Sequence, residues 1–214
     1  MPTAQNGQHH GVVYPASGLP SLWGGPVQLR RRHTDRFNND VSTRDTIVQM
    51  RRIAHEYART PCVQGITADA VRSLRPGAGH RDIAGAIHYW MRRNIRFIED
   101  ETLLAEQFGI PLEDLDKELL IVPDELACRM PVPQGDCDDY AMLGASMCIC
   151  AGLRPYWVTI AADAAEPRRF SHIYICVELR DEGTHLCIDA GNRFQTIPPG
   201  WEARAVTRKA IWAV

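Results

Sequence analysis

Residues 135–141 read Gly-Asp-Cys-Asp-Asp-Tyr-Ala and place Cys137 where a helix is expected to begin. A thiol is a useful nucleophile when its thiolate is accessible near neutral pH. The free N–H groups and the dipole of a helix N-terminus favour that negative charge. The same N–H groups can face the oxyanion that develops on an attacked carbonyl. This stretch therefore predicts a nucleophilic cysteine.

Three acids, Asp136, Asp138 and Asp139, surround this thiol. Nearby negative charge raises the pKa of a thiol, so these acids by themselves would make Cys137 a poor nucleophile. A protonated histidine beside the sulfur would offset them, and the nucleophile hypothesis requires one.

His172 is the candidate base. It lies near the start of the strand-like segment 170–179, where aliphatic residues fill alternate positions from Ile173 onward. His172 therefore shares the opposite face with Tyr174 and Cys176. A histidine in a strand has more often a structural role, so its position alone does not make it a base.

Asp189 ends the next strand-like segment, residues 185–189. In a hairpin with the preceding strand, its carboxylate could reach the far ring nitrogen of His172, fix the tautomer and stabilise the imidazolium. The alternative is a turn residue in Asp-Ala-Gly-Asn at 189–192. His185 is a rival base, which we rank lower because a histidine and its orienting acid are expected on different strands.

The elements that must position these residues follow from periodicity. Asp136 is a good N-cap, with Asp139 where a capping-box acid belongs, for a buried helix from Cys137 to about Gly152. Residues 1–40 have no sustained period and are expected to form an irregular arm before a domain over 41–214. The other expected helices are one that starts after residue 42 or 43 and is ended by Pro61, and two over 68–74 and 81–94. The expected strands are 156–161, 170–179 and 185–189, with edge strands at 201–206 and 210–214. Helices followed by a mostly antiparallel sheet predict an α+β fold.

Seven cysteines at irregular spacing, most of them in apolar contexts, favour reduced, buried thiols over a disulfide framework. Their spacing matches no usual zinc site, and we expect no metal and no cofactor.

The net charge of −2 gives no global field to recruit nucleic acid or an anionic membrane. No apolar run approaches the ~20 residues of a membrane span, and the N-terminus has no signal-peptide pattern, so we expect a cytoplasmic protein.

Four motifs, in this order, resemble the transglutaminase-like superfamily. They are Gly-Asp-Cys-Asp-Asp-Tyr-Ala at 135–141, Ala-Gly-Leu-Arg at 151–154, Ser-His-Ile-Tyr at 171–174 and Ile-Asp-Ala at 188–190. Residues 85–98 also look like the helix, and the short extended segment after it, that precede these motifs in the family. Residues 119–126, with Pro123, look like the segment that comes before the cysteine motif in bacterial and phage members. The resemblance covers about residues 80–195. One departure is Ile173, where the family often has a small residue.

The resemblance implies a papain/transglutaminase-like core, with N-terminal helices and a central Cys-bearing helix packed on the sheet. It implies Cys137 as nucleophile, His172 as general base and Asp189 as the orienting acid. Gln134, with the backbone N–H of Cys137, is the candidate for the oxyanion hole. The implied activity is that of a cysteine peptidase, amidase or transglutaminase, acting on a protein or peptide through a thioester.

Two other functions stay open. The first is a catalytically silent scaffold or assembly protein of phage origin, associated with the phage particle and docking its partner through residues 1–40. The second is a cell-wall peptidase of the other common papain-like type. The cysteine of that type is usually followed by Ser-Gly, which Asp138 and Asp139 do not match.

Overall fold

The computed structural model of the chain describes residues 27–31, 39–100, 102, 103, 106, 117–191 and 197–214. In chain order its helices and strands are β1 (Val27–Arg31), α1 (Asn39–Tyr57), α2 (Pro61–Val71), α3 (His80–Asn94), β2 (Arg96–Phe97), β3 (Lys117–Ile121), the π-helical turn η2 (Glu125–Arg129), β4 (Gln134–Gly135), α5 (Cys137–Cys150), β5 (Arg154–Ile160), β6 (His172–Leu179), β7 (Thr184–Ile188) and β8 (Lys209–Ala213).

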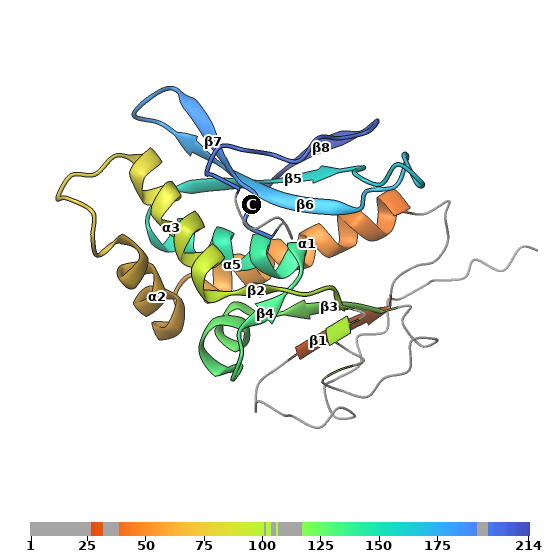
Figure 1. Cartoon of the computed structure of the whole chain (residues 1–214), viewed down its shortest axis with the longest axis horizontal. Coiled ribbons are helices and arrows are strands. Elements are labelled where there is room, and N and C mark those ends of the chain that lie inside the picture. Colours follow the sequence, from red (N-terminus) through yellow and green to blue (C-terminus); the bar gives the residue numbers. More distant parts are fainter. Residues whose placement is uncertain (1–26, 32–38, 101, 104–105, 107–116, 192–196) are drawn as a thin grey trace, which may run out of the picture.

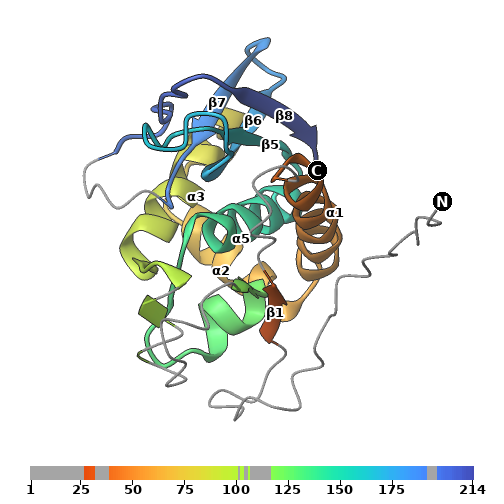
Figure 2. The same cartoon turned by 90° about the vertical axis from the view of Figure 1, so that its right-hand side faces the viewer.

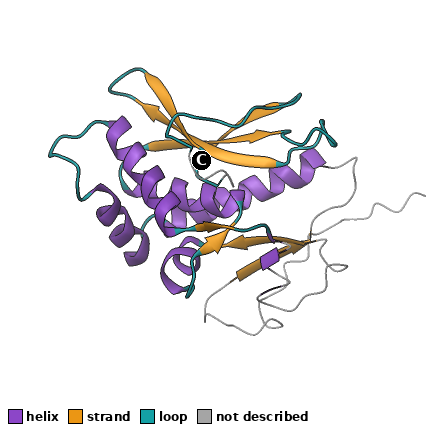
Figure 3. Ribbon diagram, in the orientation of Figure 1, coloured by secondary structure: helices purple, strands orange, loops and turns teal. Residues whose placement is uncertain are grey.

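The helices form a layer between one large sheet and two small ones (Figure 1). The large sheet is antiparallel, with strand order β7-β6-β5-β8. On the other side of the helices, β1 pairs with β3 in antiparallel fashion and β2 pairs with β4 in parallel. Figure 3 shows how the helices gather in the middle layer. The α+β class expected from the sequence is confirmed.

Helix α5 is the centre of the molecule, with α1, α2 and α3 around it (Figure 2). Its residues from Asp138 to Cys148 are all buried, which their small and apolar composition favours. Gly144 lets the helix pack closely: a Cβ there would lie 3.1 Å from Ile175 Cδ1 on β6 and from Met91 Cε on α3. The helix ends before Gly152, whose φ of 77° lies in the left-handed region that favours glycine.

The expectation that Pro61 ends the first helix was wrong. Helix α1 ends at Tyr57, and Pro61 is the first residue of α2. The Thr60 side chain caps α2 by accepting a hydrogen bond from Val63 N at 3.3 Å, and its hydroxyl donates to Asp124 Oδ1 at 2.5 Å. Proline suits this position because the first N–H of a helix has no partner within the helix.

The three principal strands were predicted within two residues at either end. The edge strand expected at 210–214 is β8, whereas the one expected at 201–206 is not a strand: that segment crosses the sheet as a loop. The expectation of an irregular arm was wrong for Val27–Arg31, which forms β1. The rest of that arm lies outside the described residues, except Asn39 and Asp40, which begin α1.

The expectation of reduced thiols was wrong for four cysteines. Cys62 and Cys128 form a disulfide that joins α2 to η2, and Cys176 and Cys187 form one between β6 and β7. Cys137, Cys148 and Cys150 lie outside these two disulfides. Among the described helices, none combines the length and the apolar character needed to cross a membrane.

Candidate functional site

Cys137 is the first residue of α5 and is partly buried. The predicted capping box is confirmed: Asp136 Oδ1 accepts from Asp138 N at 3.2 Å, and Asp139 Oδ2 accepts from Asp136 N at 3.3 Å. Both carboxylates thus take up N–H groups that a helix start leaves without a partner inside the helix. The cap fixes the direction of the backbone at the start of α5 and so the position of Cys137.

The buried side chain of Asp139 also ties the helix start to a neighbouring strand. Its Oδ1 accepts from Ile121 N, at the end of β3, at 2.7 Å. Gly135 gives this carboxylate room, since a Cβ on Gly135 would lie 2.8 Å from Asp139 Cβ, which is too close for a real contact. The Gly-Asp-Cys-Asp-Asp motif is therefore a packing unit as well as a cap.

Gln134, the candidate oxyanion donor, lies in β4 three residues before Cys137 and is only 4% exposed. It is paired with Arg96 of β2. Tyr140, one turn into α5, donates its hydroxyl hydrogen to the Ile95 carbonyl just before β2. Burial raises the pKa of the Tyr140 phenol, so it stays a neutral donor. These contacts hold the approach strand against the start of the helix.

His172 and Asp189 lie together, as the sequence predicted. His172 is the first residue of β6, and its Nε2 is 2.8 Å from Oδ1 of Asp189, which directly follows β7. Asp189 Oδ2 accepts from Ala203 N at 3.1 Å, and the carboxylate is fully buried. Because the carboxylate accepts a hydrogen bond from Nε2, it favours the imidazole tautomer that carries its proton on Nε2. Nδ1 is then the ring nitrogen that can accept another proton.

Cys137 lies beside the segment that leaves Asp189. A Cβ added to Gly191 would be 3.0 Å from Cys137 Cα and 2.9 Å from Tyr140 Cβ. Arg92 of α3 donates to the Ala190 carbonyl at 3.0 Å, which holds the same segment from the other side. The backbone after Asp189 therefore runs directly over the start of α5.

The Cys137 thiol and the His172 imidazole would have to approach each other from opposite faces of the large sheet. Helix α5 packs on the β6 face that carries Ile173, Ile175 and Val177, whereas His172 and Tyr174 point to the other face. The imidazole can reach Cys137 only round the end of the sheet, where β6 begins and β7 has finished. His172, as the first residue of its strand, lies at that end.

The rival base is not placed for the role. His185 is exposed, pairs in register with Glu178, and its ring lies edge-on to Tyr156 at 6.4 Å between centroids. His88, expected to be a packed core histidine, is fully buried, and its Nε2 is 2.8 Å from the Ile197 carbonyl. Of these three histidines, only His172 is hydrogen-bonded to Asp189.

Sequence reasoning missed two supports of this pair. One is the Cys176–Cys187 disulfide on the same sheet face, and the other is the loop around Glu202 and Ala203. A signal for the first was present, because Cys176 and Cys187 are equally distant from the turn at 180–183 and so face each other in the hairpin. No local pattern marked the loop.

Two groups of described side chains have metal-ligand atoms within 4.8 Å of one another. In the first, Asp100, Asp136 and Asp139 are all buried, but Asp136 and Asp139 are engaged as caps. In the second, Cys176 and Cys187 lie near Glu202, but their sulfurs are bonded to each other and Lys209 Nζ lies 2.7 Å from that carboxylate. Each group thus has another role in the fold.

Comparison of the chain with models of protein families, with curated proteins and with solved structures found no match.

Proposed function

We propose that the chain is a thiol-dependent amide hydrolase or acyltransferase with a papain/transglutaminase-like core, in which Cys137, His172 and Asp189 form a catalytic triad. The observation that carries the proposal is the hydrogen bond between His172 Nε2 and the buried Asp189 carboxylate. A buried carboxylate beside an imidazole stabilises the protonated ring, which is what a general base needs as it takes a proton. The placement of Cys137 at a capped helix start, next to Gly191, supports it.

In the first half of the reaction, the Cys137 sulfur attacks the carbonyl carbon of an amide, and its proton passes to His172 Nδ1. The C–N bond then breaks, and His172 returns the proton to the departing amine. The acyl group stays on Cys137 as a thioester. The Cys137 N–H at the helix start, together with Gln134, would stabilise the oxyanion.

In the second half, water or an amine attacks the thioester carbonyl. His172 takes a proton from the attacking group, the C–S bond breaks, and the proton returns to the thiolate. Water gives hydrolysis and an amine gives transfer. We propose a protein or peptide as the acyl donor, because its amides are the bonds this chemistry cleaves.

The two disulfides indicate the redox state of the compartment in which the protein acts. A cytoplasmic location, including association with a phage particle, was expected because the sequence shows no membrane span and no signal-peptide pattern, and its thiols were taken to be reduced. Disulfides form and persist mainly in oxidising environments and are rare in reducing ones. We therefore propose an oxidising compartment, in which four of the seven cysteines are paired and Cys137 lies outside both disulfides.

The test is a peptide library incubated with the protein, with and without a fluorescent primary amine, and analysed by mass spectrometry. Wild type is expected to give cleaved or amine-tagged peptides, and Cys137→Ala to give neither while keeping its folded circular dichroism spectrum. Cys150→Ala is the matched control, because Cys150 is also partly buried and outside both disulfides, and is expected to be dispensable. Turnover that persists in Cys137→Ala would overturn the proposal, and inactivity of wild type towards every library would favour the scaffold alternative.

A further inference from the structure

A loop that we call the strap, residues 197–208, crosses the outer face of the large sheet before β8. Three of its backbone N–H groups donate hydrogen bonds to other parts of the chain: Gly200 N to Cys187 O at 2.8 Å, Ala203 N to the side-chain Oδ2 of Asp189 at 3.1 Å, and Val206 N to Ala161 O at 2.7 Å. The middle bond reaches the side chain that orients His172. The strap is therefore part of the surroundings of the candidate site.

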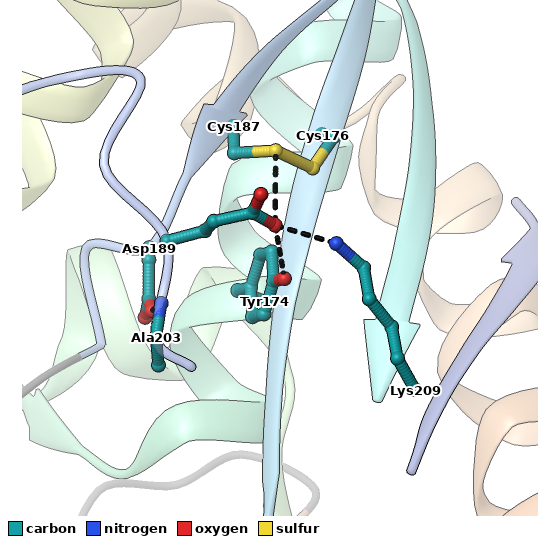
Figure 4. Close-up of a disulfide and its surroundings, with 7 residues drawn as sticks. Tyr174, Cys176, Cys187, Asp189, Ala203 and Lys209 are labelled. Atoms are coloured by element: carbon teal, nitrogen blue, oxygen red, sulfur yellow. Dashed lines mark hydrogen bonds and ion pairs between the residues drawn. A yellow bond between two sulfur atoms is a disulfide. The ribbon is translucent and has the colours of Figure 1, made fainter. Parts of the chain in front are cut away.

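Glu202 anchors the strap next to that bond. Its Oε2 accepts from the Tyr174 hydroxyl at 2.5 Å and from Lys209 Nζ at 2.7 Å, and it lies 3.9 Å from Cys187 Sγ (Figure 4). One carboxylate thus joins side chains from β6 and β8 by hydrogen bonds and packs against the Cys176–Cys187 disulfide. The hydrogen bond from Lys209, followed by that from Tyr174, lowers the pKa of Glu202, so it is an anion at neutral pH.

We propose that Glu202 is a positioning residue for the Asp189–His172 pair. The inference rests on the proposed function, because it assigns a support to the same site. Glu202 and Ala203 share a peptide bond, so holding the Glu202 side chain limits how far the Ala203 N–H can move from Asp189. That N–H occupies Asp189 Oδ2 and leaves Oδ1 to accept from His172.

The ion pair with Lys209 does not by itself explain this placement. The side chains of Lys209 and Glu202 are 43% and 39% exposed, and exposed pairs contribute little to stability. The bond from Tyr174 is different, because Tyr174 is buried and lies on the same face of β6 as His172, with the two rings 5.9 Å apart. The disulfide next along that face fixes β6 to β7 in register. Glu202 is thus held by the strand that carries His172.

If this anchor is lost, the strap can shift and the Ala203 N–H can leave Asp189. A buried carboxylate that loses a donor is costly and can turn about its Cβ–Cγ bond. His172 then loses its fixed tautomer, and Cys137 loses the base that ionises it. A role limited to stability would lower the melting temperature and leave the tautomer and the thiol reactivity unchanged.

The experiment compares Glu202→Gln with Glu166→Gln. Glu166 is the matched control, because it pairs with Arg169 at 2.9 Å and is 36% exposed, and it does not touch the site. Two properties are measured at temperatures where each variant is folded: the rate of Cys137 alkylation by iodoacetamide at pH 6 to 8, and the His172 tautomer from its ring ¹⁵N shifts. Tyr174→Phe, which removes one bond to the same carboxylate, is the second variant in case Glu202→Gln does not fold.

Glu202→Gln is expected to slow Cys137 alkylation at pH 7 about tenfold, the scale of a hydrogen bond to a charged group, and to mix the His172 tautomers. Tyr174→Phe is expected to act in the same direction, and Glu166→Gln to behave as wild type. A lower melting temperature with an unchanged tautomer would overturn the positioning role. If the wild-type thiol alkylates no faster than Cys150, the proposed function fails instead, and the tautomer still tests the strap.

Discussion

Gly191 packs so closely on Cys137 that a Cβ at position 191 would lie 3.0 Å from the Cys137 Cα atom. Two residues earlier, Asp189 holds His172 by a hydrogen bond of 2.8 Å. A segment of three residues therefore connects the candidate nucleophile with the candidate base and its orienting acid.

Gly191→Ala is expected to force the segment after Asp189 away from α5, because backbone and Tyr140 Cβ atoms stand where the new methyl group would go. Cys137 alkylation near neutral pH and any amide turnover are expected to fall, with a loss of stability of about 1–3 kcal/mol from overpacking. Gly65→Ala is the control, since a Cβ there meets nothing within 4 Å in α2 and is expected to stabilise the helix by about 0.5–1 kcal/mol. Alkylation rates and urea unfolding measure both effects. Wild-type rates in Gly191→Ala would contradict the close approach.

Asp189→Asn is expected to keep the fold and to lose turnover by roughly 10³-fold or more. The Asn oxygen would accept from Ala203 N, which turns the amide NH₂ towards His172 and selects the opposite tautomer. The measurement is turnover of any peptide found for wild type, with the His172 ¹⁵N shifts as the structural readout. Asp163→Asn, an exposed acid whose Oδ1 accepts from Ala165 N at 2.8 Å, serves as the control with no expected loss. Full activity in Asp189→Asn would remove Asp189 from the site.

His88 makes stability depend on pH. Burial lowers the pKa of His88, so the unfolded chain takes up the proton first as pH falls. The stability that neutral His88 contributes is complete above the unfolded pKa of about 6.5 and is lost as pH falls from there towards the lower folded value. Urea unfolding of wild type and His88→Gln at pH 8, 7, 6 and 5 tests this. Wild type is expected to lose its advantage below pH 6.5, and a constant difference would refute the role of His88.

The two disulfides are expected to differ in their effect on stability. Loop-closure entropy predicts that removing Cys62–Cys128, with a sequence separation of 66, costs roughly 4 kcal/mol, and removing Cys176–Cys187, with a separation of 11, roughly 3 kcal/mol. Paired Cys→Ala variants and urea unfolding measure both, with Cys150→Ala as the control for losing a thiol. Only the Cys176–Cys187 variant is expected also to slow Cys137 alkylation, because β6 and β7 carry His172 and lead to Asp189. Equal alkylation in the two paired variants would refute that selectivity.

Local rules predicted what depends on local chemistry. The capping residues Asp136 and Asp139, the buried α5 and the stop at Gly152 all follow from short-range rules, and each was found as expected. The pairing of His172 with Asp189 was also predictable, since alternation along β6 and a short hairpin decide which side chains share a face. Pro61 misled because a proline fits the first turn of a new helix as well as the end of an old one.

What the sequence did not predict depends on contacts between distant segments. The pairing of β1 with β3 joins residues about 90 positions apart, and no period in Val27–Arg31 indicates it. Residues 201–206 were expected to form an edge strand, but in the described structure Ala203 holds Asp189 and Glu202 joins β6 to β8. The thiols were misjudged because apolar surroundings suit a disulfide as well as a free cysteine.

The most direct test of the central claim is the rate of Cys137 alkylation by iodoacetamide at pH 6, in wild type and in His172→Ala, with Cys150 of the same chain as the internal reference. Ionisation by His172 predicts that wild-type Cys137 is labelled at least about tenfold faster than Cys150, and that His172→Ala removes this advantage. Equal labelling of Cys137 and Cys150 in wild type, or an advantage that survives in His172→Ala, would contradict a catalytic pairing of Cys137 with His172.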